Sequence, residues 1–209
     1  MLGLAPCYGR SGLRMRLHGE HDAVVLAAGG SRMLATPVPL LTIAGETLLQ
    51  RAVRLAKETG PTRLLVVLGS HAEQLAPLVA RSTIVFDPTW ESGLASSLAR
   101  AASALAGKTN PVLVTVIDQP CLAADHLQKL MAAYDGSCDV VSAYGDDLGP
   151  PALLRAETFA LSSKLQGGAA LRRLWAGAHP AAIRRDALGR RLETADDVAE
   201  AVAAGLLDG

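Results

Sequence analysis

The sequence predicts a three-layer α/β fold in which a mostly parallel sheet is covered by helices on both faces. Short runs of aliphatic residues alternate along the chain with longer segments whose apolar residues repeat at helical spacing. This alternation is typical of parallel strands joined by helical crossovers. Three of the short runs end at Gly29, Gly69 and Asp118. Because ligands of such folds bind at the carboxyl ends of the strands, we expect these three residues to share one crevice.

The first half of the chain contains three predicted strands and three predicted helices. The strands are Ala23–Ala28, Leu64–Leu68 and Thr83–Phe86, and the helices are Thr47–Thr59, Ala72–Ala80 and Leu94–Ala106. The strands are short, apolar and partly β-branched, as buried strands are. The helix at 47–59 has one broad apolar face opposite a basic one, and Gly60-Pro61 ends it.

The second half begins with Val112–Ile117, the most hydrophobic of the predicted strands, which ends at Asp118-Gln119-Pro120. One further strand is expected at Asp139–Ala143. Helices are predicted at Asp125–Tyr134, Glu157–Lys164, Ala169–Ala176 and Asp196–Ala204. The same strand and helix alternation therefore extends over most of the chain.

Length and composition narrow the class of protein. The 209 residues fit one domain, which we place at 21–209, and residues 1–20 are predicted to be a flexible arm. Basic and acidic side chains number 20 each, so no electrostatic basis exists for binding nucleic acid or an anionic membrane. No apolar run approaches the roughly 20 residues of a membrane helix, and the cysteines form no CxxC pair. We therefore expect a cytoplasmic protein with reduced thiols.

The loop after the first strand is the first candidate for chemistry. It reads Leu26-Ala27-Ala28-Gly29-Gly30-Ser31-Arg32-Met33. Small residues let backbone N–H groups approach phosphate oxygens, and Arg32 can neutralise charge on a departing pyrophosphate. An ordinary glycine turn is about as well supported by this segment alone, because it contains neither a GxGxxG fingerprint nor a P-loop.

Asp118 is the second candidate. Its carboxylate follows a buried strand, where a hard oxygen ligand can hold Mg²⁺ that bridges phosphates. A turn aspartate before Pro120 is the competing interpretation, and for this motif alone it is the more frequent one.

In this order the motifs resemble those of the MobA-like nucleotidyltransferases of molybdenum-cofactor biosynthesis, particularly the molybdopterin cytidylyltransferase branch. The resemblance covers Val24 to Val198. Residues 26–41, followed by Gly45 and Leu48-Leu49, are similar to the pattern LAAGxSxRMGxxKxLL with its later glycine and double leucine. Trp90 to Leu98 resembles the family's WxxGMxxSL segment, which lies beside the nucleotide base. Asp118-Gln119-Pro120 resembles the DxP motif that holds magnesium, and residues 192–197 resemble the late DIDTPED stretch.

The resemblance implies a Rossmann-type fold like that of nucleotide-diphospho-sugar transferases. It also implies transfer of a nucleoside monophosphate from CTP, which the LAAG loop favours, or from GTP, to a phosphorylated, molybdopterin-like acceptor. Arg32 and Asp118 are the expected catalytic residues, and Asp118 with Glu193 would hold Mg²⁺. The expected nucleotide-binding residues are Leu26, Ala27, Ala28, Gly29, Gly30, Ser31, Gly69, Gly93 and Ser97. A molybdoenzyme is a further candidate partner.

Three departures from the family pattern weaken the expected chemistry. One residue is missing between Ser31 and Arg32, Val38 stands where the family has lysine, and Arg191 stands at the first acid of the late stretch. Valine cannot donate to a phosphate, and losing one electrostatic donor costs about 10²- to 10³-fold in rate. Two alternatives therefore stay open. One is a non-catalytic homologue that binds a nucleotide, the cofactor or a partner enzyme, and the other is a nucleotidyltransferase for another phosphorylated acceptor, such as a sugar phosphate or phospholactate.

Overall fold

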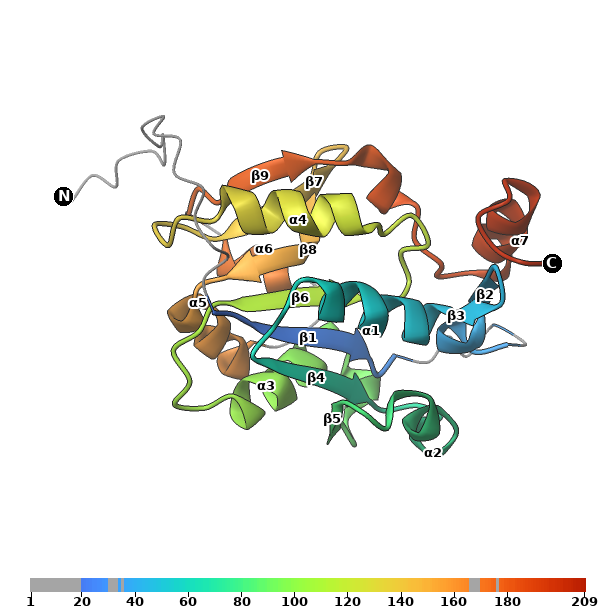
Figure 1. The fold of residues 1–209 in the computed structure, drawn as a ribbon, viewed down its shortest axis with the longest axis horizontal. Helices are drawn as coiled ribbons and strands as arrows, with labels where there is room; N and C mark the ends of the chain where they lie inside the picture. Colours follow the sequence, from blue (N-terminus) through green and yellow to red (C-terminus); the bar gives the residue numbers. More distant parts are fainter. Residues whose placement is uncertain (1–19, 30–33, 35, 166–169, 176) are drawn as a thin grey trace.

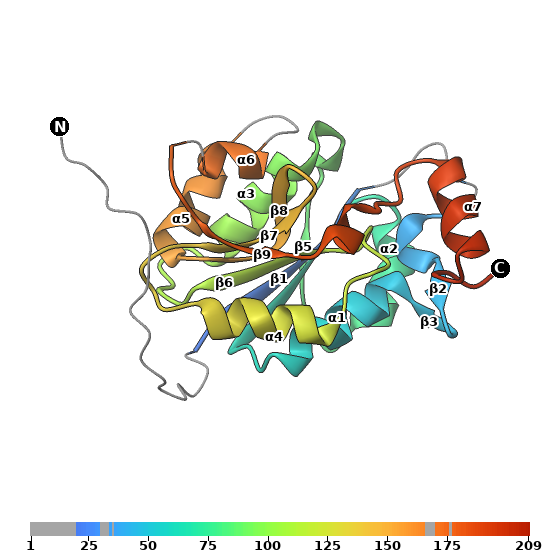
Figure 2. The same cartoon turned by 90° about the horizontal axis from the view of Figure 1, so that it is seen from above.

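The structure, a computed structural model, describes residues 20–29, 34, 36–165, 170–175 and 177–209. These residues contain a seven-stranded sheet in the order β5-β4-β1-β6-β8-β7-β9 (Figure 1). Helices α1 (Leu48–Glu58) and α4 (Ala124–Ala133) cover one face, and α3 (Leu94–Ala104), α5 (Ala156–Leu161) and α6 (Ala170–Leu174) cover the other, as Figure 2 shows from above. The predicted three-layer α/β architecture is confirmed.

The centre of the sheet is β1 (Asp22–Ala27), which pairs in parallel with β4 (Arg63–Leu68) and β6 (Val112–Val116). The edge strand β5 (Thr83–Phe86) runs parallel to β4. All six residues of β1 are buried, and successive side chains enter the two cores on opposite faces of the sheet. A strand covered on both faces needs a continuous apolar run, which explains the pattern of the sequence here.

Helix α1 shows how local sequence sets an element's limits. Thr47 and Gln50 form a capping box, with the Gln50 amide donating to Thr47 Oγ1 at 3.2 Å and the Thr47 amide donating to Gln50 Oε1 at 3.3 Å. These bonds satisfy amides that the first turn leaves unpaired. The predicted helix is therefore observed within one residue at each end.

The later half contains two strands that the sequence pattern did not predict. In addition to β7 (Val140–Tyr144), the sheet includes β8 (Asp147–Leu154), which is antiparallel to its neighbours, and β9 (Ala181–Arg184). Strand β8 contains Pro150 and Pro151, which argue against a strand because proline has no N–H to donate. The structure accommodates them where the register between β7 and β8 shifts, beyond the residues that pair with β6.

One predicted helix is split. The segment expected to be helical at 72–80 forms α2 (Ala72–Leu75) and a 3-10 turn, η2 (Ala76–Val79). Pro77 lies in the first turn of η2 and cannot continue the hydrogen bonds of α2.

The end of the chain lies beside the two-stranded hairpin that precedes α1. Strands β2 (Thr42–Ile43) and β3 (Glu46–Thr47) form a hairpin next to α7 (Ala195–Ala203) (Figure 1). The Asp208 carboxylate accepts hydrogen bonds from the turn amides of Ala44 at 2.9 Å and Gly45 at 2.8 Å. This contact holds the late part of the chain near the carboxyl ends of the strands.

Candidate active site

A pocket of about 340 Å³ lies at the carboxyl ends of β1 and β6, and we call it the strand-end pocket. Residues from four distant segments line it, together with Val38 and Trp90: Leu26, Ala28 and Gly29; Gly93, Leu94 and Ser97; Val116, Ile117 and Asp118; and Arg191, Leu192 and Glu193. The parallel strands thus bring Gly29 and Asp118 to one crevice, whereas Gly69, which was predicted to share it, is not part of its lining.

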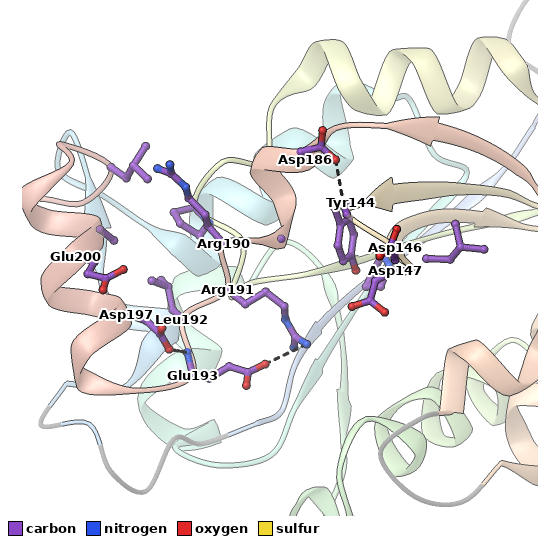
Figure 3. A pocket seen from close by; sticks show the side chains of 18 of the residues that line it. Tyr144, Asp146, Asp147, Asp186, Arg190, Arg191, Leu192, Glu193, Asp197 and Glu200 are labelled. Carbon is purple, nitrogen blue, oxygen red and sulfur yellow. Dashed lines mark hydrogen bonds and ion pairs between the residues drawn. The ribbon is translucent and has the colours of Figure 1, made fainter.

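A larger pocket of about 970 Å³, the hairpin pocket, adjoins it beside the β7–β8 hairpin and α7 (Figure 3). Acidic side chains are prominent in its lining: Asp146, Asp147, Asp186, Glu193, Asp197 and Glu200. Both pockets include Leu94 and the segment 191–193, which follows η5 (Asp186–Gly189). In Figure 3, Arg191 extends from this segment and ends beside Glu193. The segment 191–193 is therefore the boundary between the two pockets.

The predicted nucleotide-binding residues divide into three groups. Five of them line the strand-end pocket: Leu26, Ala28, Gly29, Gly93 and Ser97. Ala27 and Gly69 do not, and Gly30, Ser31 and the predicted catalytic Arg32 lie outside the described residues. Ala27 points into the core on the opposite face of the sheet because side chains alternate along a strand.

Gly69 has a packing role in the structure. A Cβ atom built on it would lie 2.5 Å from Trp90 Cβ and 2.8 Å from the carbonyl oxygen of Ala28. No side chain fits in that space, so glycine is needed at the end of β4 for Trp90 to approach β1. The close approach to Trp90 is a reason for glycine at this position that the sequence did not reveal, and the predicted contact of Gly69 with a nucleotide stays a prediction.

Ser97 lines the strand-end pocket, but its hydroxyl is already engaged. It donates to Asp87 Oδ2 at 2.9 Å, and Ser96 donates to the same oxygen at 2.7 Å. Asp87 is fully buried after β5. Burial alone would raise the pKa of Asp87, but hydrogen bonds from Ser96, Ser97 and Thr89 hold it below its ordinary value. Ser97 therefore anchors α3 to a buried carboxylate that the sequence did not single out.

Asp118 is paired with Arg191, 73 residues later in the chain. Arg191 Nε and Nη2 donate to Asp118 Oδ2 at 3.1 and 2.5 Å, and Arg191 Nη1 lies 3.1 Å from Glu193 Oε1. The backbone contributes to the contact, since the Leu192 amide donates to the Asp118 carbonyl at 2.9 Å. One guanidinium thus bridges the two acids that were predicted to hold a metal.

The electrostatics of Arg191 follow from this pairing. Burial by itself would lower the pKa of Arg191, but the charge of Asp118, its hydrogen bonds and the charge of Glu193 outweigh it. The pKa of Arg191 therefore lies above its ordinary value. The guanidinium carries its charge at every pH at which the protein is folded.

The arrangement does not fit a Mg²⁺ ion held by Asp118 and Glu193. Such an ion requires octahedral oxygen ligands, and here the guanidinium occupies the space between the carboxylates. Asp118 Oδ1 is buried and has no hydrogen-bond partner, but one oxygen alone does not make a cation site. Across the described ranges, no group of three or more His, Cys, Asp or Glu side chains is placed to hold a metal ion. The sequence noted Arg191 only as a missing acid, and did not foresee that its side chain would pair with Asp118 and Glu193.

Gln119 organises the site and was missed as a functional residue. Its buried side chain donates from Nε2 to the carbonyls of Pro150 and Leu188, each at 3.0 Å. These bonds fasten β8 and η5 to the end of β6. A glutamine between an aspartate and a proline gives no local signal for such a role.

Val38 also lines the strand-end pocket, together with Leu26, Ala28 and Gly29 from the early part of the chain, and we call these four residues the early side of the pocket. It begins the short 3-10 helix η1 (Val38–Leu40), is 5% exposed, and packs into the core beneath α1. Val38, which the sequence comparison expects at the lysine position of the pattern, is therefore an apolar core residue.

In the part of the chain that the structure describes, no helix has the length and apolar character needed to span a membrane.

Curated proteins of similar sequence match part of this chain. Bifunctional protein GlmU from Corynebacterium jeikeium is 34% identical over 133 residues, which are 59% of this chain and 27% of that protein. The matched regions span 27% to 32% of such curated relatives.

Two solved structures illustrate the shared fold. The crystal structure of an Rv0371c homologue from Mycobacterium sp. strain JC1 has a TM-score of 0.75 and 28% identity, with 88% of this chain and 96% of that chain covered. Molybdopterin-guanine dinucleotide biosynthesis protein A from Archaeoglobus fulgidus has a TM-score of 0.63 and 15% identity, with coverages of 88% and 97%. The model of the MobA-like NTP transferase domain matches residues 23–185, and the chain belongs to this family.

Proposed function

We propose that this protein transfers a nucleoside monophosphate from CTP, or from GTP, to a phosphorylated acceptor of the molybdopterin type in the cytoplasm. An oxygen of the acceptor phosphate forms a bond to the α-phosphorus of the nucleotide. The bond from that phosphorus to the oxygen bridging the α- and β-phosphates breaks, and pyrophosphate leaves. A molybdoenzyme is the expected recipient of the finished cofactor.

The observation that carries the proposal is the pair of adjoining pockets. Their volumes of about 340 and 970 Å³ are in the range of small-molecule sites. The strand-end pocket suits the nucleotide because Ala28 and Gly29 leave room for phosphates at the strand ends. The hairpin pocket has the larger volume and so leaves room for the acceptor. The two substrates would meet at the boundary segment 191–193, beside Asp118.

The proposed catalytic residues are Arg32 and Asp118. Arg32, with the amides of Gly30 and Ser31, would neutralise the leaving pyrophosphate. Asp118 would contribute by holding Arg191 at the boundary between the two substrates. Positioning and charge do most of the work in reactions of this type.

A binding protein without turnover is the second candidate function. Val38 places an apolar side chain where a donor to phosphate is expected, and Asp118 is already paired with Arg191. Under this alternative, nucleotide would occupy the strand-end pocket but no pyrophosphate would form.

Calorimetric titration of CTP and of GTP into the protein tests both candidates. Micromolar binding of one nucleotide is expected, followed by pyrophosphate release when a phosphorylated pterin acceptor is added. Binding without release with any acceptor would favour the second candidate. No binding of either nucleotide would rule out the proposed transfer reaction and would leave the second candidate only as a protein that binds the cofactor or a partner enzyme.

A further inference from the structure

The strand-end pocket has a single described source of positive charge. A nucleoside triphosphate carries close to four negative charges at neutral pH, and its binding requires cationic partners. Within the described lining of this pocket, Arg191 is the one basic side chain. Val38, on the opposite side, offers no charge. The cation of the described pocket therefore comes from the late segment of the chain.

The geometry of Arg191 leaves it able to bind a ligand. A guanidinium has five N–H donors, and the contacts to Asp118 and Glu193 use one each at Nε, Nη2 and Nη1. With only the described residues as partners, two N–H groups remain, one on each terminal nitrogen. The Arg191 side chain is 44% exposed, and it lines both pockets. A held, half-exposed guanidinium with two unused donors is suited to phosphate oxygens.

The charge of residue 191 also affects whether this site requires a metal ion. An aspartate at position 191 would leave carboxylates facing one another at the end of β6, and a divalent cation would be required to balance them. Arginine and aspartate differ by two units of charge, which equals the charge of one such ion. With Arg191, the pair formed with Asp118 is already neutral.

We propose that the Arg191 guanidinium takes the place of a metal ion in this site, so that the protein binds the triphosphate through Arg191 without a metal site of its own. This inference rests on the proposed function, because it assumes that the strand-end pocket holds the nucleotide. It also accounts for Val38, since Arg191 on the opposite side of the pocket supplies a positive charge that residue 38 does not.

Calorimetric titration of CTP in EDTA and in millimolar Mg²⁺ tests the binding role. For the wild-type protein, the two dissociation constants should agree within about threefold. Arg191→Ala should weaken binding by about 10- to 100-fold in both buffers, the size expected for charged hydrogen bonds. Arg191→Asp should lose binding in EDTA and recover at least tenfold in Mg²⁺. The matched control is Arg81→Asp, which makes the same charge change next to the amino end of β5 and should leave both constants unchanged.

Titration of Mn²⁺ followed by electron paramagnetic resonance tests the metal role without nucleotide. Wild-type protein should show no site tighter than about 1 mM, and Arg191→Asp should gain one, because it places an added carboxylate beside Asp118 and Glu193. Thermal unfolding of each variant verifies that it is folded.

The outcomes separate the two proposals. CTP that binds wild-type protein only with Mg²⁺, or a wild-type Mn²⁺ site tighter than about 1 mM, overturns this inference and leaves the proposed function standing. If neither CTP nor GTP binds in either buffer, the proposed function and the phosphate-binding role of Arg191 both fail. The Mn²⁺ titration then still decides whether Arg191 has displaced the ion.

Discussion

The two sides of the strand-end pocket differ in kind. The early side, formed by Leu26, Ala28, Gly29 and Val38, is apolar or small in its described residues. The late side, formed by Arg191 and Glu193 with Asp118 between them and the sheet, is an ionic network. The early side is built from the central strand and the core. The late side is a connecting segment fastened by a few hydrogen bonds.

The two sides are held by different interactions: the early side by packing, and the late side by ion pairs. The early side depends on close packing, which tolerates Val38 because the side chain joins the core. The late side depends on the ion pairs of Arg191 with Asp118 and Glu193, which lie outside the strands of the sheet. Catalytic capacity in this chain should therefore be more sensitive to changes on the late side.

The largest effect is expected for Asp118→Ala. Removing the carboxylate frees Arg191 from its orientation at the boundary of the pockets, and pyrophosphate release should fall by about 10²- to 10³-fold. The control is Asp196→Ala, an exposed acid on α7 that lines neither pocket. A rate within threefold of wild type would show that Asp118 takes no part in the reaction.

The second-largest effect is a pH dependence of stability that we expect from His126, which contacts the β7–β8 hairpin. His126 Nε2 lies 2.8 Å from the Ser142 hydroxyl, which donates to the Pro151 carbonyl at 2.6 Å. Because that hydroxyl proton is used, neutral His126 must donate from Nε2. Burial lowers the pKa of His126 to about 4, from 6.5.

Between these values the unfolded chain binds more protons than the folded one, so stability should fall as the pH falls from about 6.5 to 4. The loss amounts to as much as about 3 kcal/mol. Urea unfolding at several pH values should show this loss for wild type and for His179→Gln, whose site is exposed. In His126→Gln the pH dependence over this interval should be smaller. An unchanged pH dependence in His126→Gln would contradict the assignment.

A smaller effect is expected for Gln119→Leu, which keeps the size of the side chain but removes both hydrogen bonds to β8 and η5. The free energy of unfolding should fall by about 2 kcal/mol, at about 1 kcal/mol for each bond. Gln128→Leu, on the exposed face of α4, serves as the control in the same urea titration. Equal stability of the two variants would mean that Gln119 does not fasten the late side.

The smallest effect is expected in a double variant that places a positive charge on the early side of the pocket and removes it from the late side. In Val38→Lys/Arg191→Gln the cation moves from one side of the pocket to the other, and CTP affinity should stay within about tenfold of wild type, or about 1.4 kcal/mol. Val38→Lys alone should bind CTP more tightly and unfold more easily, because it buries an amine. Calorimetry and thermal unfolding measure the two quantities. If Val38→Lys is folded but its CTP affinity is unchanged, the phosphates do not lie near residue 38.

The fold was largely predictable because its signals are local. The run at β1, the capping residues of α1 and the glycine after β4 each lie within a few residues of the element they define. Strand β8 was missed for a physical reason, since two prolines argue against a strand unless a register shift accommodates them. No pattern in a single sequence announces such a shift.

The candidate site was only half predictable. The ends of β1 and β6 identified Gly29 and Asp118, because parallel strands bring their carboxyl ends together. The contacts of Gly69 with Trp90 and of Ser97 with Asp87 could not be predicted, because both partners come from other segments of the chain.

Periodicity and motifs are properties of neighbouring residues, so the α/β class, the central strands, the family resemblance and the position of Asp118 could be predicted without the folded structure. What Asp118 faces could not. Arg191 reaches it across 73 residues because the Leu192 amide and the Gln119 side chain fasten the late segment to the end of β6. Charge pairing acts through space, and the partner of a carboxylate is known only once the chain is folded.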